Sequence, residues 1–274
     1  MAKYESLDWY STPLWYDLVF EEDTKKEADF LEEAMRRYAK LAPRRGRASG
    51  RGSARSRGRV LEPASGSGRL VEEMARRGWD VTGFDASPEM LEFTRRRLAR
   101  AGLRATLKRA RLESFRLPGR FDVAHCFVST FKYLLDERSA REHLRRVAAA
   151  LRPGGLYLLG FHLSDYRWPL GDHERWVARR GATKVVCNIK SWPPSRRTRL
   201  EKVRSRLLVE TRGKLRRTET TWWFRTYDAE EVRALLRSVP EFEHLATYDF
   251  HYDWKRPRTL DDRQLDTLLI LRRR

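Results

Sequence analysis

The chain is poor in cysteine and has no long apolar run. Its two cysteines among 274 residues, Cys126 and Cys187, are too few for a disulfide framework or, by themselves, a zinc site. No stretch approaches the roughly 20 apolar residues that a membrane-spanning helix needs. The first residues, MAKYESLDWY, lack the basic and then apolar plan of a secretion signal. These absences predict a cytoplasmic protein with no membrane partner and no metal site.

Acidic residues are also comparatively few. The chain has 38 of them against 58 Lys and Arg, which gives a formal net charge of +20. The excess is clustered, because residues 44–59 contain seven arginines and no acid, and residues 196–217 contain ten basic residues and two glutamates. Such clusters are typical of proteins that attract a polyanion or an anionic small molecule, and also of solvated basic loops. Composition leaves both interpretations open.

The remaining composition, 41% hydrophobic and 11% aromatic, is that of a folded chain. Residues 25–40 have the apolar spacing of an amphipathic helix, and the Arg, Gly and Ser that follow are typical of a flexible linker. From Val60 onward strand-like and helix-like segments alternate. The predicted divisions are an N-terminal helical cap (1–43), a flexible linker (44–59), a core (58–165 and 227–274) and a small antiparallel β insertion (166–226).

The alternation predicts the fold class. Strands are expected at 59–64, 79–85, 105–112, 121–128 and 156–162, with helices at 68–77, 87–101 and 137–151 between them. Ser87 and Asp136 are expected to cap two of these helices, and Asp228 with Glu231 forms a capping box before a last helix. Largely apolar strands that alternate with helices indicate a parallel sheet covered on both faces. Two final strands, near 242–252 and 264–273, complete a doubly wound α/β sheet.

A glycine-rich turn within residues 60–70, VLEPASGSGRL, lets a ligand approach the backbone closely. A Walker A phosphate loop needs Gly-Lys-Ser/Thr at its end, whereas Arg-Leu follows Gly68. A dinucleotide fingerprint fits Gly66 and Gly68 but meets Val71 at its third glycine. Asp85 ends the next predicted strand and suits a ribose, because a carboxylate can accept from both hydroxyls.

Four segments resemble successive motifs of the class I S-adenosylmethionine-dependent methyltransferases: LEPASGSG, VTGFDASPEML, RFDVAHCFVSTFKYL and LRPGGLYLL. The resemblance covers residues 58–162. It implies a Rossmann-like, mostly parallel seven-stranded sheet with a reversed last strand, in agreement with the paired final strands. The segments WYDLVF and CFVSTFKYL are also similar to small-molecule N-methyltransferases, including those that act on nucleotide-linked amino sugars.

The resemblance implies S-adenosylmethionine as the cofactor and S-adenosylhomocysteine as its product. It assigns the acid of the first motif to Glu62, the ribose-binding acid to Asp85 and a tyrosine that closes the site to Tyr16. The expected cofactor-binding residues are Tyr16, Glu62, Ala64, Ser65, Gly66, Gly68, Asp85, Ala86, Met90, Leu112, Glu113 and Phe127. The family usually has an aspartate near the adenine amino group where this chain has Arg111, which offers no acceptor. Glu113, a backbone carbonyl or a loss of binding are the alternatives.

The acceptor is expected beyond the carboxyl ends of the fourth and fifth predicted strands, where ligands of open α/β sheets bind. Tyr133, His162 and Asp165 lie there and are the catalytic candidates. Methyl transfer requires an acceptor lone pair in line with the methyl group, and an ammonium acceptor must first lose a proton. His162 is the first candidate base because its ordinary pKa lies near neutrality, and Asp165 is the second. The alternative is that His162 only ends a strand, and His125 is expected to be a satisfied core histidine.

The predicted function is methyl transfer (EC 2.1.1) to a nitrogen or oxygen of a small molecule, possibly anionic or nucleotide-linked. The clustered arginines motivate one alternative, an RNA or DNA methyltransferase, although no base-flipping tetrapeptide of the Asn/Asp-Pro-Pro-Tyr type is present. Arg111 motivates another, a catalytically inactive S-adenosylmethionine-binding or regulatory protein. A homodimer is left open.

Overall fold

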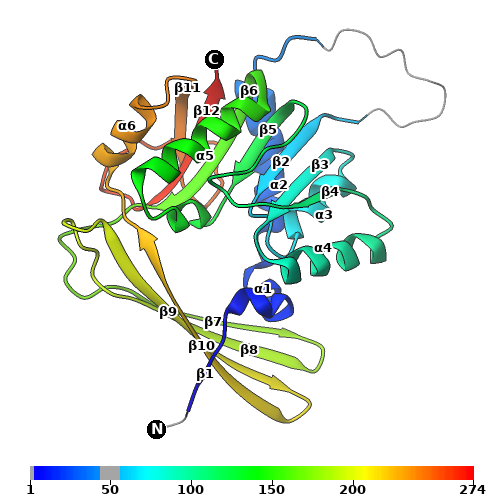
Figure 1. Ribbon diagram of the computed structural model, residues 1–274, viewed down its shortest axis with the longest axis vertical. Coiled ribbons are helices and arrows are strands. Elements are labelled where there is room, and N and C mark those ends of the chain that lie inside the picture. The colour runs from blue at the N-terminus through cyan, green and yellow to red at the C-terminus, as the bar shows by residue number, and fades with distance from the viewer. Residues whose placement is uncertain (1–2, 44–55) are drawn as a thin grey trace.

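A computed structural model describes residues 3–43 and 56–274, and its core is a seven-stranded sheet (Figure 1). The strands are Arg59–Pro63 (β2), Asp80–Asp85 (β3), Thr106–Arg109 (β4), Phe121–Cys126 (β5), Leu151–His162 (β6), Phe242–Tyr248 (β11) and Asp266–Arg273 (β12). They are ordered β11-β12-β6-β5-β2-β3-β4. Five of them, from β6 to β4, are parallel, and β12 is antiparallel to both of its neighbours. The predicted sheet with a reversed last strand is confirmed.

Helices cover both faces of this sheet. They are Thr24–Tyr38 (α2), Arg69–Arg76 (α3), Pro88–Arg100 (α4), Glu137–Ala150 (α5) and Ala229–Arg237 (α6). Leu31 of α2 shares a buried cluster with Val60, whereas Leu144 of α5 and Val232 of α6 share another with Leu61. Val60 and Leu61 are adjacent in β2, and successive side chains of a strand point to opposite faces. The nearly continuous apolar strands are therefore explained by burial on both sides.

The helix starts agree with the sequence. Ser87 and Asp136 each accept a hydrogen bond from a backbone N–H in the first turn of α4 and α5. Asp228 and Glu231 form the reciprocal capping box at α6. These caps satisfy N–H groups that the first helical turn leaves without an intrahelical partner.

A second sheet lies beside the core. Its strands are Glu5–Ser6 (β1), His173–Arg180 (β7), Thr183–Ser191 (β8), Leu200–Thr211 (β9) and Lys214–Arg225 (β10), in the order β1-β10-β9-β8-β7. It is antiparallel apart from the parallel β1–β10 pair. One face packs on the short 3-10 helix Trp9–Ser11 (η1) and on Pro13–Phe20 (α1), which lies between the two sheets (Figure 1). The predicted β insertion is thus a sheet of its own.

Two strands, β1 and β7, were not predicted from the sequence. Both are edge strands, and β7 has the sequence HERWVARR, with one solvated face and no run of β-branched residues. β6 also begins earlier than expected, at Leu151, and includes the RPGG segment. Gly154 has φ +79°, and a Cβ there would overlap the backbone of Lys40, whose N–H donates to the Gly154 carbonyl at 2.9 Å.

Part of the predicted domain division falls on residues that the structure does not describe. Residues 44–55 of the expected linker lie outside the described residues, and β2 already begins at Arg59. Within the described ranges, no helix is both long and apolar enough to cross a membrane. The same residues hold no group of three or more His, Cys, Asp or Glu placed to bind a metal ion, and Cys126 and Cys187 are both buried and free.

Candidate active site

The glycine-rich turn between β2 and α3 has left-handed backbone at three positions. Ala64, Gly66 and Gly68 have φ of 51°, 52° and 73°. A Cβ at Gly68 would lie 2.6 Å from the Thr94 hydroxyl of α4, so only glycine fits there. Gly68 therefore serves the packing of α3 against α4. The backbone of residues 64–66 remains open toward the cavities described below.

Asp85, at the carboxyl end of β3, links this turn to the turn between β3 and α4. Its Oδ2 accepts from the Gly66 N–H at 2.8 Å and its Oδ1 accepts from the Ser87 N–H at 2.9 Å. Burial raises the pKa of Asp85, and these backbone hydrogen bonds oppose the rise. Each carboxylate oxygen keeps a further lone pair. Asp85 can therefore hold the turn and still accept from a pair of ligand hydroxyls.

A cavity of about 500 Å³, cavity A, opens over Asp85. Eight of the sequence-predicted residues line it: Tyr16, Ala64, Gly66, Asp85, Ala86, Leu112, Glu113 and Tyr133. Arg111 also lines it, with its Nε donating to Glu113 Oε1 at 2.6 Å. The unfavourable arginine is thus paired with the acid that was expected to replace the missing aspartate. Gly68 and Met90, both expected to bind cofactor, line neither this cavity nor its neighbour.

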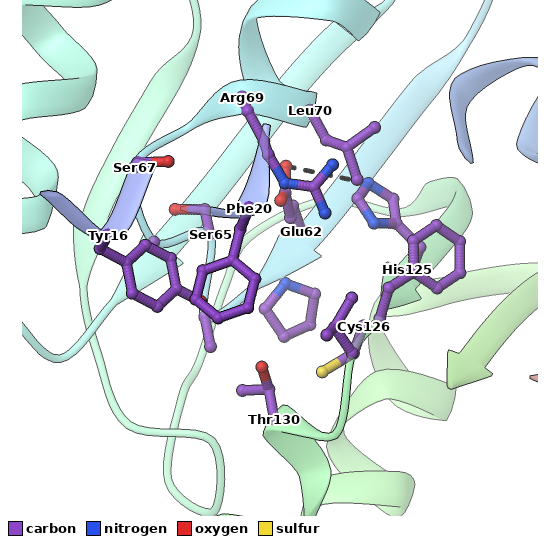
Figure 2. A pocket seen from close by; sticks show the side chains of 15 residues that line it. Tyr16, Phe20, Glu62, Ser65, Ser67, Arg69, Leu70, His125, Cys126 and Thr130 are labelled. Carbon is purple, nitrogen blue, oxygen red and sulfur yellow. Dashed lines mark ion pairs between the residues drawn. The ribbon is translucent and has the colours of Figure 1, made fainter. Parts of the chain in front are cut away.

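The neighbour, cavity B, is smaller and more polar (Figure 2). Glu62, Ser65 and Phe127 line it as predicted, together with residues that the sequence reasoning missed, Arg69 and Phe20 among them. Tyr16, Ala64, Gly66 and Thr130 line both cavities, which are therefore adjacent. Asp85 borders cavity A, and Glu62 and Arg69 border cavity B.

Buried polar atoms without partners face cavity B. Glu62 Oε2 and His125 Nε2 lie 3.8 Å apart, as the dashed line in Figure 2 marks. Among the described residues neither atom has a hydrogen-bond partner, and neither does Ser65 Oγ. Burial raises the pKa of Glu62 to about 8 and lowers that of His125 to about 3, so both are neutral near pH 7. His125 is a core histidine as expected, but an unsatisfied one.

Arg69, the first residue of α3, is held in place by a buried acid. Its Nη2 donates to Glu27 Oε1 of α2 at 2.9 Å, and the Tyr252 hydroxyl donates to the same carboxylate at 3.1 Å. Glu27 is only 2% exposed. A bidentate carboxylate partner of this kind orients a guanidinium rigidly. The sequence showed Arg69 only as the residue that excluded a Walker loop.

The helix that carries Tyr16 is anchored by another buried acid. Asp17 is fully buried, and its Oδ2 accepts from Arg97 of α4 at 2.6 Å and from Arg180 of β7 at 3.0 Å. One carboxylate thus joins α1 to both the core and the second sheet. Tyr16 is held over the junction of cavities A and B in consequence.

A pair of tyrosines lines one side of cavity A. The hydroxyl groups of Tyr10 and Tyr133 lie 2.7 Å apart, and burial raises the pKa of both, so they remain protonated. Both residues, with Asp8, also line a third cavity of about 390 Å³, cavity C, which is walled by Trp9 and Trp222. The sequence suggested Tyr133 but gave no signal for Tyr10.

The segment after β5 has an unusual backbone. Val128 and Ser129 are consecutive non-glycine residues with φ of 56° and 64°. Such strain persists where the surrounding structure enforces it, often at functional sites. Ser129 Oγ accepts from the backbone N–H of His162 at 3.3 Å, which ties this segment to the end of β6.

The other two catalytic candidates lie outside the linings of cavities A, B and C. His162 Nδ1 is 2.7 Å from Asp266 Oδ1, at the point where β6 and β12 pair. Asp165 is bound by Arg167 at 3.1 Å. Of the three catalytic candidates, Tyr133 is therefore the one that lines the cavities, and it borders both cavity A and cavity C.

Comparison with known proteins identifies this architecture. A family profile described as "Methyltransferase domain" matches residues 60–155, the segment from β2 into β6 that supplies most of the residues lining cavities A and B. Residues 60–155 therefore match a methyltransferase domain, and the chain as a whole has the Rossmann-like fold of a solved S-adenosylmethionine-dependent methyltransferase. The chain is 31% identical over 134 residues to a glycine/sarcosine N-methyltransferase of Parasynechococcus marenigrum (strain WH8102), with 47% of this chain and 45% of that protein covered. The chain spans about half the length of the curated relatives it matches.

Solved structures resemble the chain over nearly its whole length. CalS10 of Micromonospora echinaspora, an amino pentose methyltransferase solved with S-adenosylmethionine bound, has a TM-score of 0.67 at 18% identity, over 99% of this chain and 100% of that one. KedS8 of Streptoalloteichus sp ATCC 53650, a sugar N-methyltransferase, has a TM-score of 0.71 at 17% identity, over 100% and 96% of the chains. At these identities the likeness is one of fold, and it includes the second sheet.

Proposed function

We propose that the protein transfers the methyl group of S-adenosylmethionine to a nitrogen or oxygen of a small-molecule acceptor. The observation that carries the proposal is the adjacency of cavities A and B, which share the lining residues Tyr16, Ala64, Gly66 and Thr130. A nucleoside fits the end with Asp85. A charged amino-acid portion fits the end where Glu62, Ser65 and Arg69 gather.

The residues of cavity B fit this cofactor on their own chemistry. Glu62 Oε2, His125 Nε2 and Ser65 Oγ are buried without partners, and orphaned buried polar atoms are costly unless a ligand or water satisfies them. An ammonium and a carboxylate would provide partners for these atoms and for the Arg69 guanidinium. Bound cofactor supplies an electrophilic methyl group on a sulfonium. Asp85 would hold the ribose hydroxyls, and Tyr16 would cover the centre.

The acceptor would lie in cavity C, beside Tyr133. Tyr10 and Tyr133 border both cavity A and cavity C, so a group in cavity C is adjacent to the cofactor space. Trp9 and Trp222 stack at 4.8 Å between ring centroids and exclude water from one wall. Position and dehydration supply most of the rate of such a transfer. Two neutral tyrosine hydroxyls can orient an amine or hydroxyl acceptor. His162 with Asp266 lines none of the three cavities, so as the proposed base it would take the acceptor's proton through an intervening water and not by direct contact.

The nitrogen of an amino compound is the favoured acceptor atom. The relatives include glycine/sarcosine N-methyltransferases, and among the similar structures CalS10 is described as an amino pentose methyltransferase and KedS8 as a sugar N-methyltransferase. Other relatives are ubiquinone biosynthesis O-methyltransferases, which keeps oxygen as the second option. An anionic or nucleotide-linked acceptor agrees with the high positive charge.

The test is cofactor binding followed by transfer of a labelled methyl group. Calorimetry with S-adenosylmethionine is expected to show one site per chain. Labelled methyl should then pass to members of a panel of amino sugars, nucleotide-linked amino sugars and glycine. Absence of cofactor binding would contradict the proposal and favour an inactive regulatory protein. Label that appears only on transfer RNA would favour a nucleic-acid methyltransferase instead.

A further inference from the structure

The outer face of the second sheet is separate from the three cavities of the active site. Val185, Leu207 and Val209 point inward, where they pack with Trp9 and Leu18. Residues that alternate with these along β8 and β9 point outward because successive strand side chains point to opposite sides. Part of this outer face, including Arg204 and Arg206 of β9, comes from the arginine-rich segment 196–217 whose purpose the sequence left open.

Strand register gathers donors on this face into two adjacent rows. His173, Lys190 and Arg204 are aligned across β7, β8 and β9. In the next row Arg175, Asn188 and Arg206 are aligned in the same way. A concavity of about 270 Å³ lies between the rows, lined by Tyr4, His173, Asn188, Lys190, Arg204 and Arg206. None of these residues lines cavity A, B or C.

One acid, Glu219 of β10, compensates these charges only in part. Arg206 Nε donates to its Oε2 at 2.6 Å, and Arg204 Nε is 3.7 Å from the same oxygen. Within the described residues no carboxylate forms an ion pair with Lys190 or Lys202. These two cations and Arg204 instead lie 5.1 to 5.5 Å from the ring centre of Trp192. An aromatic face holds cations in place without cancelling their charge.

We propose that this concavity binds a small molecule that carries a phosphate or diphosphate group. Arg204 and Arg206 offer planar forks for phosphate oxygens, Lys190 a point charge, and Asn188 an amide donor. The guanidinium carbon of Arg206 lies 4.6 Å from the centre of the Tyr4 ring. Tyr4 therefore provides a flat surface beside the charges. The small, bounded concavity favours a compact anion over an extended polyanion. The site stands independently of the proposed methyl transfer.

The experiment uses the full chain and calorimetry with orthophosphate, inorganic pyrophosphate, UDP and uridine. Three proteins are compared: wild type, the double variant Lys190→Gln/Arg204→Gln, and the control Arg179→Gln/Lys184→Gln, which removes two charges from the other end of the same sheet. Pyrophosphate is expected to bind wild type and control alike, and to bind the first double variant at least about tenfold more weakly. Uridine should not bind. UDP tighter than pyrophosphate would add a nucleoside contact, and equal affinity would limit recognition to the phosphates.

Equal weakening in both double variants would overturn the proposal, because it would reflect the overall charge alone. Single-stranded DNA that binds with affinity rising with length, in the absence of pyrophosphate binding, would replace it with a nucleic-acid surface. A dimer in light scattering that the first double variant dissociates would show the face to be a subunit interface. Thermal melting checks that each variant is folded. Binding of S-adenosylmethionine gives a second check, because neither Lys190 nor Arg204 lines cavity A or B.

Discussion

His162 and Asp266 form a close pair, with 2.7 Å between Nδ1 and Oδ1, although 104 residues separate them in the chain. The pair joins the end of β6 to the start of β12 and lies edge-on to Phe250. A carboxylate at Nδ1 fixes the tautomer and leaves the Nε2 lone pair available for a proton. Asp266 is accordingly a positioning residue for the proposed base.

Asp266→Asn is expected to lower kcat by about tenfold or more while the Kd of S-adenosylmethionine stays unchanged. His162→Gln should produce a similar loss, and the double variant no more than the larger single effect, because the two side chains act as a unit. The ¹⁵N chemical shifts of the His162 imidazole should report a changed tautomer in Asp266→Asn. Unchanged kcat in both single variants would remove the pair from the reaction.

Asp85→Ala is expected to weaken binding of S-adenosylmethionine about 10- to 100-fold, because hydrogen bonds to a partly buried carboxylate are lost. Calorimetry measures the change directly. Asp80→Ala, an exposed acid at the opposite end of β3, is the matched control and should leave the affinity unaltered. Similar affinities in both variants would contradict the assignment of Asp85 to the ribose.

Gly68→Ala is expected to lower the free energy of unfolding by about 1 to 3 kcal/mol, since its Cβ would overlap Thr94. Gly78→Ala is the control: it has φ +86° but nothing within 4 Å of the added Cβ, so it carries backbone strain alone. Chemical denaturation should rank Gly68→Ala as the more costly. The addition of Thr94→Ala should recover part of the loss, and no recovery would argue against the steric explanation.

Stability is expected to depend on pH through Glu62. Burial raises its folded-state pKa to about 8 from an ordinary 4.5, so between these values the folded state binds more protons than the unfolded state. Its contribution to the free energy of unfolding is therefore complete at low pH and lost as the pH rises through this window. Glu62→Gln, which does not titrate, should gain in Tm relative to wild type between about pH 5 and pH 8.

Glu241→Gln, at an exposed position, is the control and should track wild type across the same range. His125 acts in the opposite sense, because its pKa is lowered to about 3 and the unfolded state takes up the proton first as the pH falls. Its effect is therefore confined to pH values below about 6.5. A Tm difference between Glu62→Gln and wild type that is constant with pH would mean that Glu62 is charged in the folded protein.

The sequence determined the parts of this protein that depend on local chemistry. Apolar strands that alternate with amphipathic helices required a parallel sheet covered on both faces. Ser87, Asp136 and Asp228 marked helix starts, because each caps a backbone N–H only three residues further along the chain. The ligand-binding turn around Gly66 and Gly68 and the strand-end acid Asp85 could also be predicted from the sequence, because each depends on residues within one short segment.

Only the tertiary structure decided which distant groups meet. Tyr10 pairs with Tyr133 across 123 positions, and Arg69 meets Glu27 across 42. The fold also buried Glu62 and His125 together without partners, and strand register turned scattered arginines into rows around one concavity. Contacts of this kind arise from the crossing of chain segments, and no spacing within either segment records them. The core could be predicted because its residues act on their neighbours in sequence, whereas the site is made by neighbours in space.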